Sequence, residues 1–278
     1  MDTRHLQRMG DLGVAVPLPF SPRDEDSIRR ATENSDIVIN LIGKDYETSS
    51  LPWGVNCSYE EAHVDVAGKV ARIAVEQGVS TLVHVSALAA DEHSLSRWAR
   101  SKALGEAAVR AEAPGATIVR PADVFGPRDR LLSLFSFMNK ALPRVPLVDG
   151  GHARLQPLFV QDLAYALERI ALSTQPDIAL GQTYDLAPSV MNISPTVADV
   201  IGKVVGVWPE PPLCADRMTR MGIDNVLNVA APTKRLADLG IEATSMELPG
   251  LQFLSVEKHG DHFLEMETEE TIQFRERA

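Results

Sequence analysis

The sequence contains only two cysteines, Cys57 and Cys214, which lie far apart and form no CxxC pair. This spacing matches no metal-ligand pattern, so we expect two reduced, structural thiols and no metal site. The seven histidines form no HExxH pattern, and the chain has no GxSxG motif. Zinc-peptidase and serine-hydrolase chemistry therefore have no support. No apolar run approaches the roughly 20 residues of a transmembrane segment.

Positive charge is also scarce, with 27 basic against 38 acidic residues and a net charge of −11. General nucleic-acid binding requires a basic surface, so the composition argues against it. Acidic residues gather at 242–270, which are either a solvated arm or a docking segment for a partner. With 278 residues, 45% of them hydrophobic, the chain can form one large α/β domain or a domain with a smaller lobe.

Short apolar runs alternate with helical patterns through the first two-thirds of the chain. Strands alternating with helices predict a doubly wound parallel α/β sheet of the Rossmann type. The run at 36–43 is continuously apolar, which is typical of a parallel strand covered on both faces. Expected strands lie at 14–20, 36–43, 81–86 and 116–121, and expected helices at 26–31, 59–77 (with Gly78 as its C-cap), 96–111, 131–142 and 162–173.

A glycine-rich turn between a first strand and its helix, the phosphate loop of dinucleotide-binding sheets, is missing. Gly10 and Gly13 are three residues apart, but no apolar strand precedes them. We therefore expect a sheet without its first strand. Either the chain is truncated at its N-terminus or the cofactor site lacks the loop that holds the pyrophosphate, and truncation is favoured because loss of a central strand would leave its neighbour unpaired. The expected domains are a Rossmann-like domain at 1–126 with 156–174 packed on it, a smaller lobe from 127–155 and 175–250, and an acidic tail at 251–278.

Several segments together carry a resemblance that runs nearly from end to end. The chain resembles the atypical extended short-chain dehydrogenase/reductases, and more narrowly the nucleotide-binding accessory subunit (39 kDa-like, alpha subcomplex subunit 9 type) of mitochondrial respiratory complex I. The segments that carry it are His5–Gly13, Val38–Gly43, His84–Leu88, Ser101–Glu106, Arg120–Gly126, Gln156–Asp162 and Leu239–Thr244.

The resemblance implies that a bound dinucleotide contacts the carboxyl ends of the strands. The implied cofactor-binding residues are Asn40, Leu41, Ile42, Gly43, Ser86, Lys102, Pro121, Asp123 and Val124. Each has a structural alternative: Gly43 as a plain loop glycine, Ser86 as a loop hydroxyl, Lys102 as a solvated helix lysine and Asp123 as a turn cap. Arg23 is either a contact for a 2′-phosphate or an ordinary surface arginine. For His84 we expect a packed or backbone-bonded imidazole.

Trp98 stands one helical turn before Lys102, so the two side chains share a face. In active relatives a tyrosine at this spacing is the proton donor, and the lysine lowers its pKa and binds the nicotinamide ribose. An indole N–H donates a hydrogen bond but cannot act as a general acid near neutral pH. Ser86, Trp98 and Lys102 therefore form a degenerate catalytic site, and we expect no catalytic residue.

The resemblance implies a non-catalytic subunit of the NADH:ubiquinone oxidoreductase of the respiratory chain. Such a subunit works in electron transport on the matrix side of the mitochondrial inner membrane, near the quinone site. It would hold NADPH as a stabilising ligand among the other subunits of complex I. Without a glycine-rich loop, we expect this chain as written to bind NADPH weakly or not at all. Two alternatives remain: a soluble NAD(P)-dependent oxidoreductase or epimerase, and a regulatory binder of dinucleotides.

Overall fold

The computed structural model describes residues 15–50, 54–126, 129, 153–188, 215–228 and 230–244. The chain divides into two compact units. Of the described residues, unit 1 contains 15–50, 54–120, 167–184 and 232–234, and unit 2 contains the remainder. The expected helix at 131–142 and the acidic tail at 251–278 lie outside the described residues. The expected division into domains stays a prediction.

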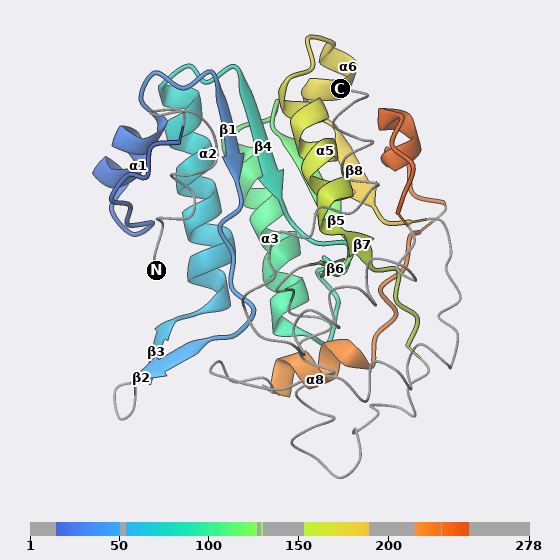
Figure 1. Cartoon of the computed structure of the whole chain (residues 1–278). Helices are drawn as coiled ribbons and strands as arrows, with labels where there is room; N and C mark the ends of the chain where they lie inside the picture. Colours follow the sequence, from blue (N-terminus) through green and yellow to red (C-terminus); the bar gives the residue numbers. More distant parts are fainter. Residues whose placement is uncertain are drawn as a thin grey trace, which may run out of the picture. The chain divides into compact units, whose positions relative to one another are not determined.

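A four-stranded sheet organises the described chain, with strand order β1-β4-β5-β8 (Figure 1). The strands are β1 (Ile37–Asn40), β4 (Thr81–Val85), β5 (Thr117–Pro121) and β8 (Thr183–Leu186). β4 pairs in parallel with both β1 and β5, and Asn40 lies opposite His84. Parallel pairing brings the carboxyl ends of these strands to one edge of the sheet. The predicted α/β class with parallel strands is confirmed.

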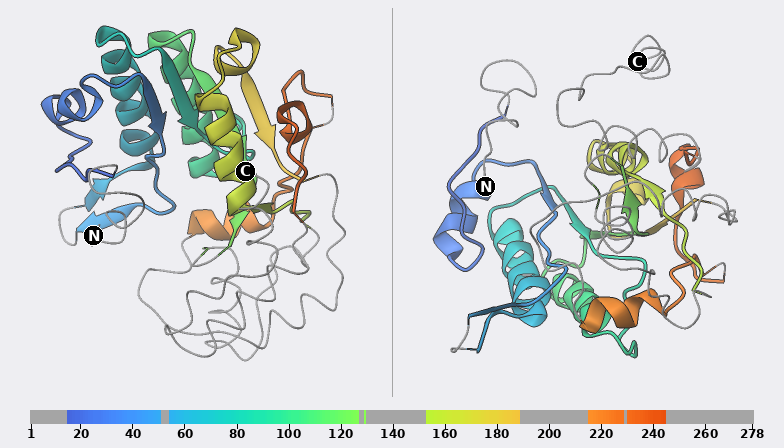
Figure 2. Two further views of the ribbon diagram at one scale, coloured as in Figure 1. Left: turned by 45° about the horizontal axis from the view of Figure 1, so that its top comes forward. Right: turned by 60° about the horizontal axis from the view of Figure 1, so that its bottom comes forward.

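Three helices of unit 1 accompany these strands, and α2 lies between the other two (Figure 2). They are α1 (Glu25–Thr32), α2 (Val66–Glu76) and α3 (Arg97–Glu112). The Asp24 side chain caps α1 by accepting from the amide of Asp26, and Ser96 caps α3 by accepting from Ala99. α2 is preceded by one π-helical turn, η2 (Glu61–Asp65). Gly78, with φ +75°, supplies the left-handed residue that follows α2.

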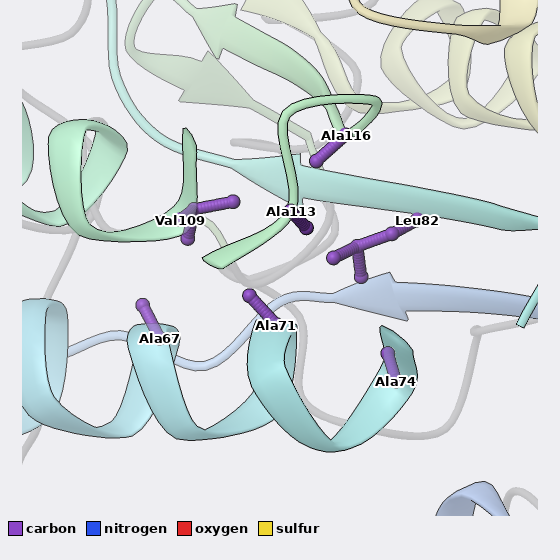
Figure 3. Close-up of a cluster of buried hydrophobic side chains, with 7 residues drawn as sticks. All are labelled: Ala67, Ala71, Ala74, Leu82, Val109, Ala113 and Ala116. Atoms are coloured by element: carbon purple, nitrogen blue, oxygen red, sulfur yellow. The ribbon is translucent and has the colours of Figure 1, made fainter. Parts of the chain in front are cut away.

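Small side chains let α2 and α3 pack closely against the sheet. Figure 3 shows this core cluster, in which alanines of α2 and of the loop after α3, together with Val109 of α3, lie around Leu82 of β4. Its members are Ala67, Ala71, Ala74, Leu82, Val109, Ala113 and Ala116. A second cluster joins Ile28 of α1 to Val66, Val70 and Ile73 of α2. These clusters fix the two helices that present the candidate site.

Two expectations for the first strands are wrong. Residues 15–20 form no strand, because Pro17 and Pro19 lack the amide hydrogens that strand pairing needs. β1 is not covered on both faces. Val38 packs against the helices, but Ile39, which alternation turns to the opposite face, is 39% exposed. The other predicted helices and strands within the described residues are confirmed, with ends that differ by a few residues.

The remaining elements are short. A hairpin in unit 1 pairs β2 (Thr48–Ser50) with β3 (Gly54–Cys57). In unit 2, β6 (Val124–Phe125) pairs in parallel with β7 (Leu158–Phe159), and their phenylalanine rings lie 5.3 Å apart. The other elements are α5 (Val160–Ala171), α6 (Pro176–Ala179), α8 (Ala215–Met221) and η4 (Leu236–Leu239).

Candidate functional site

Two polar side chains meet where β1 and β4 end. The Asn40 amide nitrogen lies 3.2 Å from Nδ1 of His84, and the Asn40 Oδ1 accepts from the amide of Ile42 at 3.0 Å. Burial lowers the pKa of His84 to about 3, and the positive charge of Lys102 adds to this effect. His84 is therefore neutral and packed, and the Asn40 side chain fixes the first residues beyond β1.

Ser86 follows β4 at the same edge of the sheet. Its amide donates to the carbonyl of Val119 at 2.8 Å, which extends the pairing of β4 with β5 by one residue. The Ser86 side chain is 5% exposed, and its hydroxyl has no hydrogen-bond partner among the described residues. A buried hydroxyl without a partner costs about 1–3 kcal/mol, and a bound ligand would recover this free energy.

Trp98 and Lys102 lie on one face of α3, as their spacing predicts. The indole Nε1 of Trp98 donates to the backbone carbonyl of Lys44 at 2.7 Å. The ammonium of Lys102 lies 5.7 Å from the centre of the Trp98 ring, within the range of a cation–π interaction. Lys102 is 7% exposed, so it is a buried lysine and not a solvated one.

Gly43 lies directly against the Lys102 ammonium. A Cβ atom at Gly43 would come within 3.1 Å of the Lys102 Nζ and within 3.7 Å of the His63 Nε2. A side chain here would require the Lys102 ammonium to shift by a few tenths of an ångström, so the glycine allows the loop and the lysine to approach closely. The loop after β1 and helix α3 therefore meet at this point.

His63 connects the same loop to α3 and was not singled out in the sequence. Its Nε2 accepts from the amide of Lys44 at 3.0 Å, and its Nδ1 lies 2.8 Å from the Ser101 hydroxyl. Ser101 donates its own hydrogen to the carbonyl of Trp98 at 2.8 Å. These bonds assign the proton of the imidazole to Nδ1.

The rings around His63 and the backbone beneath it are also closely packed. Tyr59 stacks on the imidazole with ring centres 5.8 Å apart, and Trp98 meets it edge-on at 6.2 Å. A Cβ at Gly105 would lie 2.2 Å from the His63 carbonyl oxygen. The only sequence signals for this cluster were the one-turn spacings of Tyr59 with His63 and of Ser101 with Gly105, which are too common to identify a site.

The remaining predicted site residues make none of the contacts described above for Gly43, His63, Trp98 and Lys102. Ile42 packs on the second core cluster, whereas Leu41 is 65% exposed. Pro121, Asp123 and Val124 belong to unit 2, where Asp123 accepts from the side-chain amide of Asn225 at 2.9 Å. Their predicted role in cofactor binding stays a prediction.

Arg23 forms a two-pronged ion pair with Glu61, with one N···O distance of 3.0 Å. This pairing favours the interpretation of Arg23 as an ordinary surface arginine. Within the described ranges, no group of three or more histidine, cysteine or acidic side chains is placed to hold a metal ion. The described helices include none with the length and hydropathy needed to span a membrane.

The fold is similar to those of nucleotide-sugar enzymes of known structure. A dTDP-glucose 4,6-dehydratase from Bacillus anthracis in complex with NAD superposes with a TM-score of 0.61 at 14% identity, covering 91% of this chain and 83% of that one. A dTDP-glucose 4,6-dehydratase from Streptomyces venezuelae gives a TM-score of 0.51 at 17% identity, covering 65% and 60%. At these identities the likeness shows the fold alone.

Sequence comparison is more specific, although no family model matches the chain. The mitochondrial NADH dehydrogenase (ubiquinone) 1 alpha subcomplex subunit 9 of Arabidopsis thaliana is 39% identical over 74% of this chain, which spans half of that relative. The Rattus norvegicus protein of the same name is 35% identical over 97% of this chain and 74% of its own length. A shorter match covers 37% of the chain at 40% identity, to a Caulobacter vibrioides protein named ceramide reductase. The chain belongs to the family of NADH dehydrogenase (ubiquinone) 1 alpha subcomplex subunit 9.

Proposed function

We propose that this chain is a non-catalytic accessory subunit of respiratory complex I, which holds NADPH as a structural ligand. The family membership supports the assignment to the complex. The arrangement at the ends of β1 and β4 supports a bound dinucleotide. The same resemblance supports a location on the matrix side of the mitochondrial inner membrane, near the quinone site.

The hydrogen bond of Trp98 carries the non-catalytic part of the proposal. The position where active short-chain dehydrogenases have a tyrosine holds an indole, whose N–H is bound to the carbonyl of Lys44. The indole N–H does not ionise at neutral pH, and its hydrogen bond is already made to a backbone carbonyl. Loss of a general acid lowers a rate by about 10²–10⁴-fold, so turnover at ordinary enzymatic rates is not expected.

The residues at the site fit the nicotinamide end of a dinucleotide. Ser86 offers a buried hydroxyl that no other described residue binds, and Lys102 brings a buried ammonium against the backbone of Gly43. Lys102 would bind ribose hydroxyls, and Ser86 would hydrogen-bond the nicotinamide side. A ligand that binds only the folded state stabilises it by mass action, so a structural role needs no chemistry.

Native electrophoresis of tagged protein from mitochondria of the source organism tests the assignment to the complex. We expect the chain to migrate with the NADH:ubiquinone oxidoreductase and to yield NADPH upon denaturation of the isolated complex. A chain that runs free and oxidises NADPH with a carbonyl substrate would instead be a soluble oxidoreductase. Bound NADH in place of NADPH would contradict only the choice of nucleotide.

A further inference from the structure

Two hydrogen bonds hold the loop after β1, and both are made by the backbone of Lys44. The amide of Lys44 donates to the His63 imidazole, and its carbonyl accepts from the Trp98 indole. Both partners lie outside the loop, His63 on the turn before α2 and Trp98 on α3. The backbone at Lys44 is therefore fixed by two side chains that are distant in the sequence.

The same loop forms the wall against which Lys102 lies. The Nζ of Lys102 and the Nε2 of His63 would both lie within 4 Å of a Cβ atom at Gly43, so they flank the same glycine. The single lone pair of Nε2 is used by the Lys44 amide. His63 thus holds the loop without competing for the hydrogens of the lysine.

The imidazole is itself held in one orientation. Its Nδ1–H points to Ser101, whose hydroxyl hydrogen goes to the carbonyl of Trp98. Tyr59 stacks on one ring face, and His63 is 2% exposed. A side chain fixed at both nitrogens can transmit the position of α3 to the loop.

We propose that His63 is a positioning residue for the nucleotide site, acting through its Nε2 bond to Lys44. This bond sets the backbone of Gly43 and Lys44, and through it the places of the Trp98 indole and the Lys102 ammonium. The proposal rests on the proposed function for the identity of the ligand. The bond from Nδ1 to Ser101 only orients the ring.

Two substitutions at His63 distinguish the role of Nε2 from the role of Nδ1. In His63→Gln, the side-chain oxygen reaches the place of Nε2 and can accept from Lys44, but the bond to Ser101 is lost. In His63→Asn, the shorter amide reaches the place of Nδ1 and can donate to Ser101, but the bond to Lys44 is lost. Both variants remove the stacking on Tyr59, so each is the control for the other.

The primary measurement is hydrogen exchange of the Trp98 indole N–H by NMR, with global unfolding in urea as the reference. In His63→Asn we expect exchange about tenfold faster than in the unsubstituted chain, because the loop that accepts the indole hydrogen is freed. In His63→Gln we expect exchange within about threefold of the unsubstituted chain. Equal exchange in the two variants, or exchange that only follows global stability, overturns the proposal.

Calorimetric titration with NADPH to millimolar concentration gives the second measurement. We expect His63→Asn to bind about tenfold more weakly than His63→Gln at similar global stability. Equal affinities with unequal indole exchange would show that His63 positions the loop but not the ligand, which overturns the proposal as stated. If the unsubstituted chain binds no NADPH, the nucleotide-binding part of the proposed function fails, and indole exchange alone decides the role of His63. Should His63→Asn fail to fold, His63→Leu replaces it, because it also offers no acceptor to the Lys44 amide. Indole exchange in His63→Leu that stays within about threefold of the unsubstituted chain overturns the proposal.

Discussion

Trp98 stands where the resemblance predicts a tyrosine, and it shares one property of a tyrosine and lacks another. Both side chains are amphipathic and can donate a hydrogen bond from the end of a rigid ring, but only the phenol can release a proton. In this chain the donated bond goes to the backbone of Lys44. The residue therefore joins α3 to the loop after β1, and the degenerate position contributes to the packing of the site.

Replacing Trp98 with tyrosine is therefore expected not to create a working dehydrogenase. The carbonyl of Lys44 faces this position and would accept the phenol hydrogen, so the new hydroxyl would be held by the backbone. NADPH oxidation with a panel of carbonyl compounds is the measurement, and the Trp98→Tyr variant should not exceed a Lys102→Ala variant. Turnover clearly above that of Lys102→Ala would show that a general acid at position 98 is all that the site needs for dehydrogenase activity.

At the scale of elements, the contact between α3 and the turn η2 depends on one glycine. A Cβ at Gly105 would lie 2.2 Å from the carbonyl oxygen of His63, and a backbone atom cannot move aside as a flexible side chain would. Gly68 in α2 offers a matched control, because a Cβ there would meet only the Ala108 side chain at 3.7 Å.

We expect Gly105→Ala to lower the free energy of unfolding by about 1–3 kcal/mol through overpacking. Gly68→Ala should raise it by about 0.5–1 kcal/mol, because alanine loses less backbone entropy than glycine in a helix. Urea unfolding of the two variants measures both effects. A stabilising Gly105→Ala would mean that α3 can shift away from His63 at no cost.

A second link joins α3 to β5 through an ion pair. The Glu106 carboxylate, 7% exposed, receives bonds from the Arg120 guanidinium at 2.9 and 2.6 Å. The pair of Glu60 with Arg97 is similar in kind, but both of its side chains are about half exposed and 3.4 Å apart.

We expect Glu106→Gln to cost about 1.5–3 kcal/mol of stability, because a half-buried arginine then faces a neutral amide. Glu60→Gln should cost less than about 1 kcal/mol, since water screens exposed pairs. Thermal unfolding at low and high salt distinguishes the two ion pairs. The loss of stability caused by Glu60→Gln should become smaller as the salt concentration rises. Equal costs for the two substitutions would contradict the role assigned to burial.

At the scale of the whole molecule, His84 makes stability depend on pH. Burial and, second, the Lys102 charge lower the pKa of His84 from 6.5 to about 3 in the folded chain. In the unfolded chain the imidazole titrates near its ordinary value, so between these two pH values only the unfolded state binds the proton. The contribution of neutral His84 is complete above about pH 6.5 and declines as the pH falls, by up to about 1.4 kcal/mol per pH unit.

The variant His84→Asn should remove this decline while costing some stability at neutral pH, since asparagine keeps an acceptor for Asn40 and leaves a small cavity. Chemical denaturation at a series of pH values between about 7 and 4 measures the slope. The exposed His93 provides the matched substitution, His93→Asn, at a position without burial. If the free energy of unfolding of His84→Asn depends on pH as steeply as that of the unsubstituted chain, the pH dependence comes from other groups.

The fold was largely predictable because its signals are local. Alternating apolar runs and helical periodicity located β1, β4, β5, α2 and α3, and Ser96 was recognisable at the start of α3. The false strand at 15–20 arose because an apolar run outweighed two prolines. The exposed face of β1 was not predictable, because periodicity does not show what covers a strand.

The sequence by itself determined the class of the fold, the family, and the shared face of Trp98 and Lys102, since each depends on residues near one another in the chain or on the order of motifs. Only the tertiary structure showed that His63 and Trp98 bind the amide and the carbonyl of the same residue, Lys44, and that Gly43 borders Lys102. It also showed that the Ser86 hydroxyl is buried with no hydrogen-bond partner among the described residues. The Trp98–Lys44 bond joins residues 54 positions apart, and Gly43 lies 59 positions before Lys102. Such pairings arise when helices pack on a sheet, and no local pattern records which side chains will then meet.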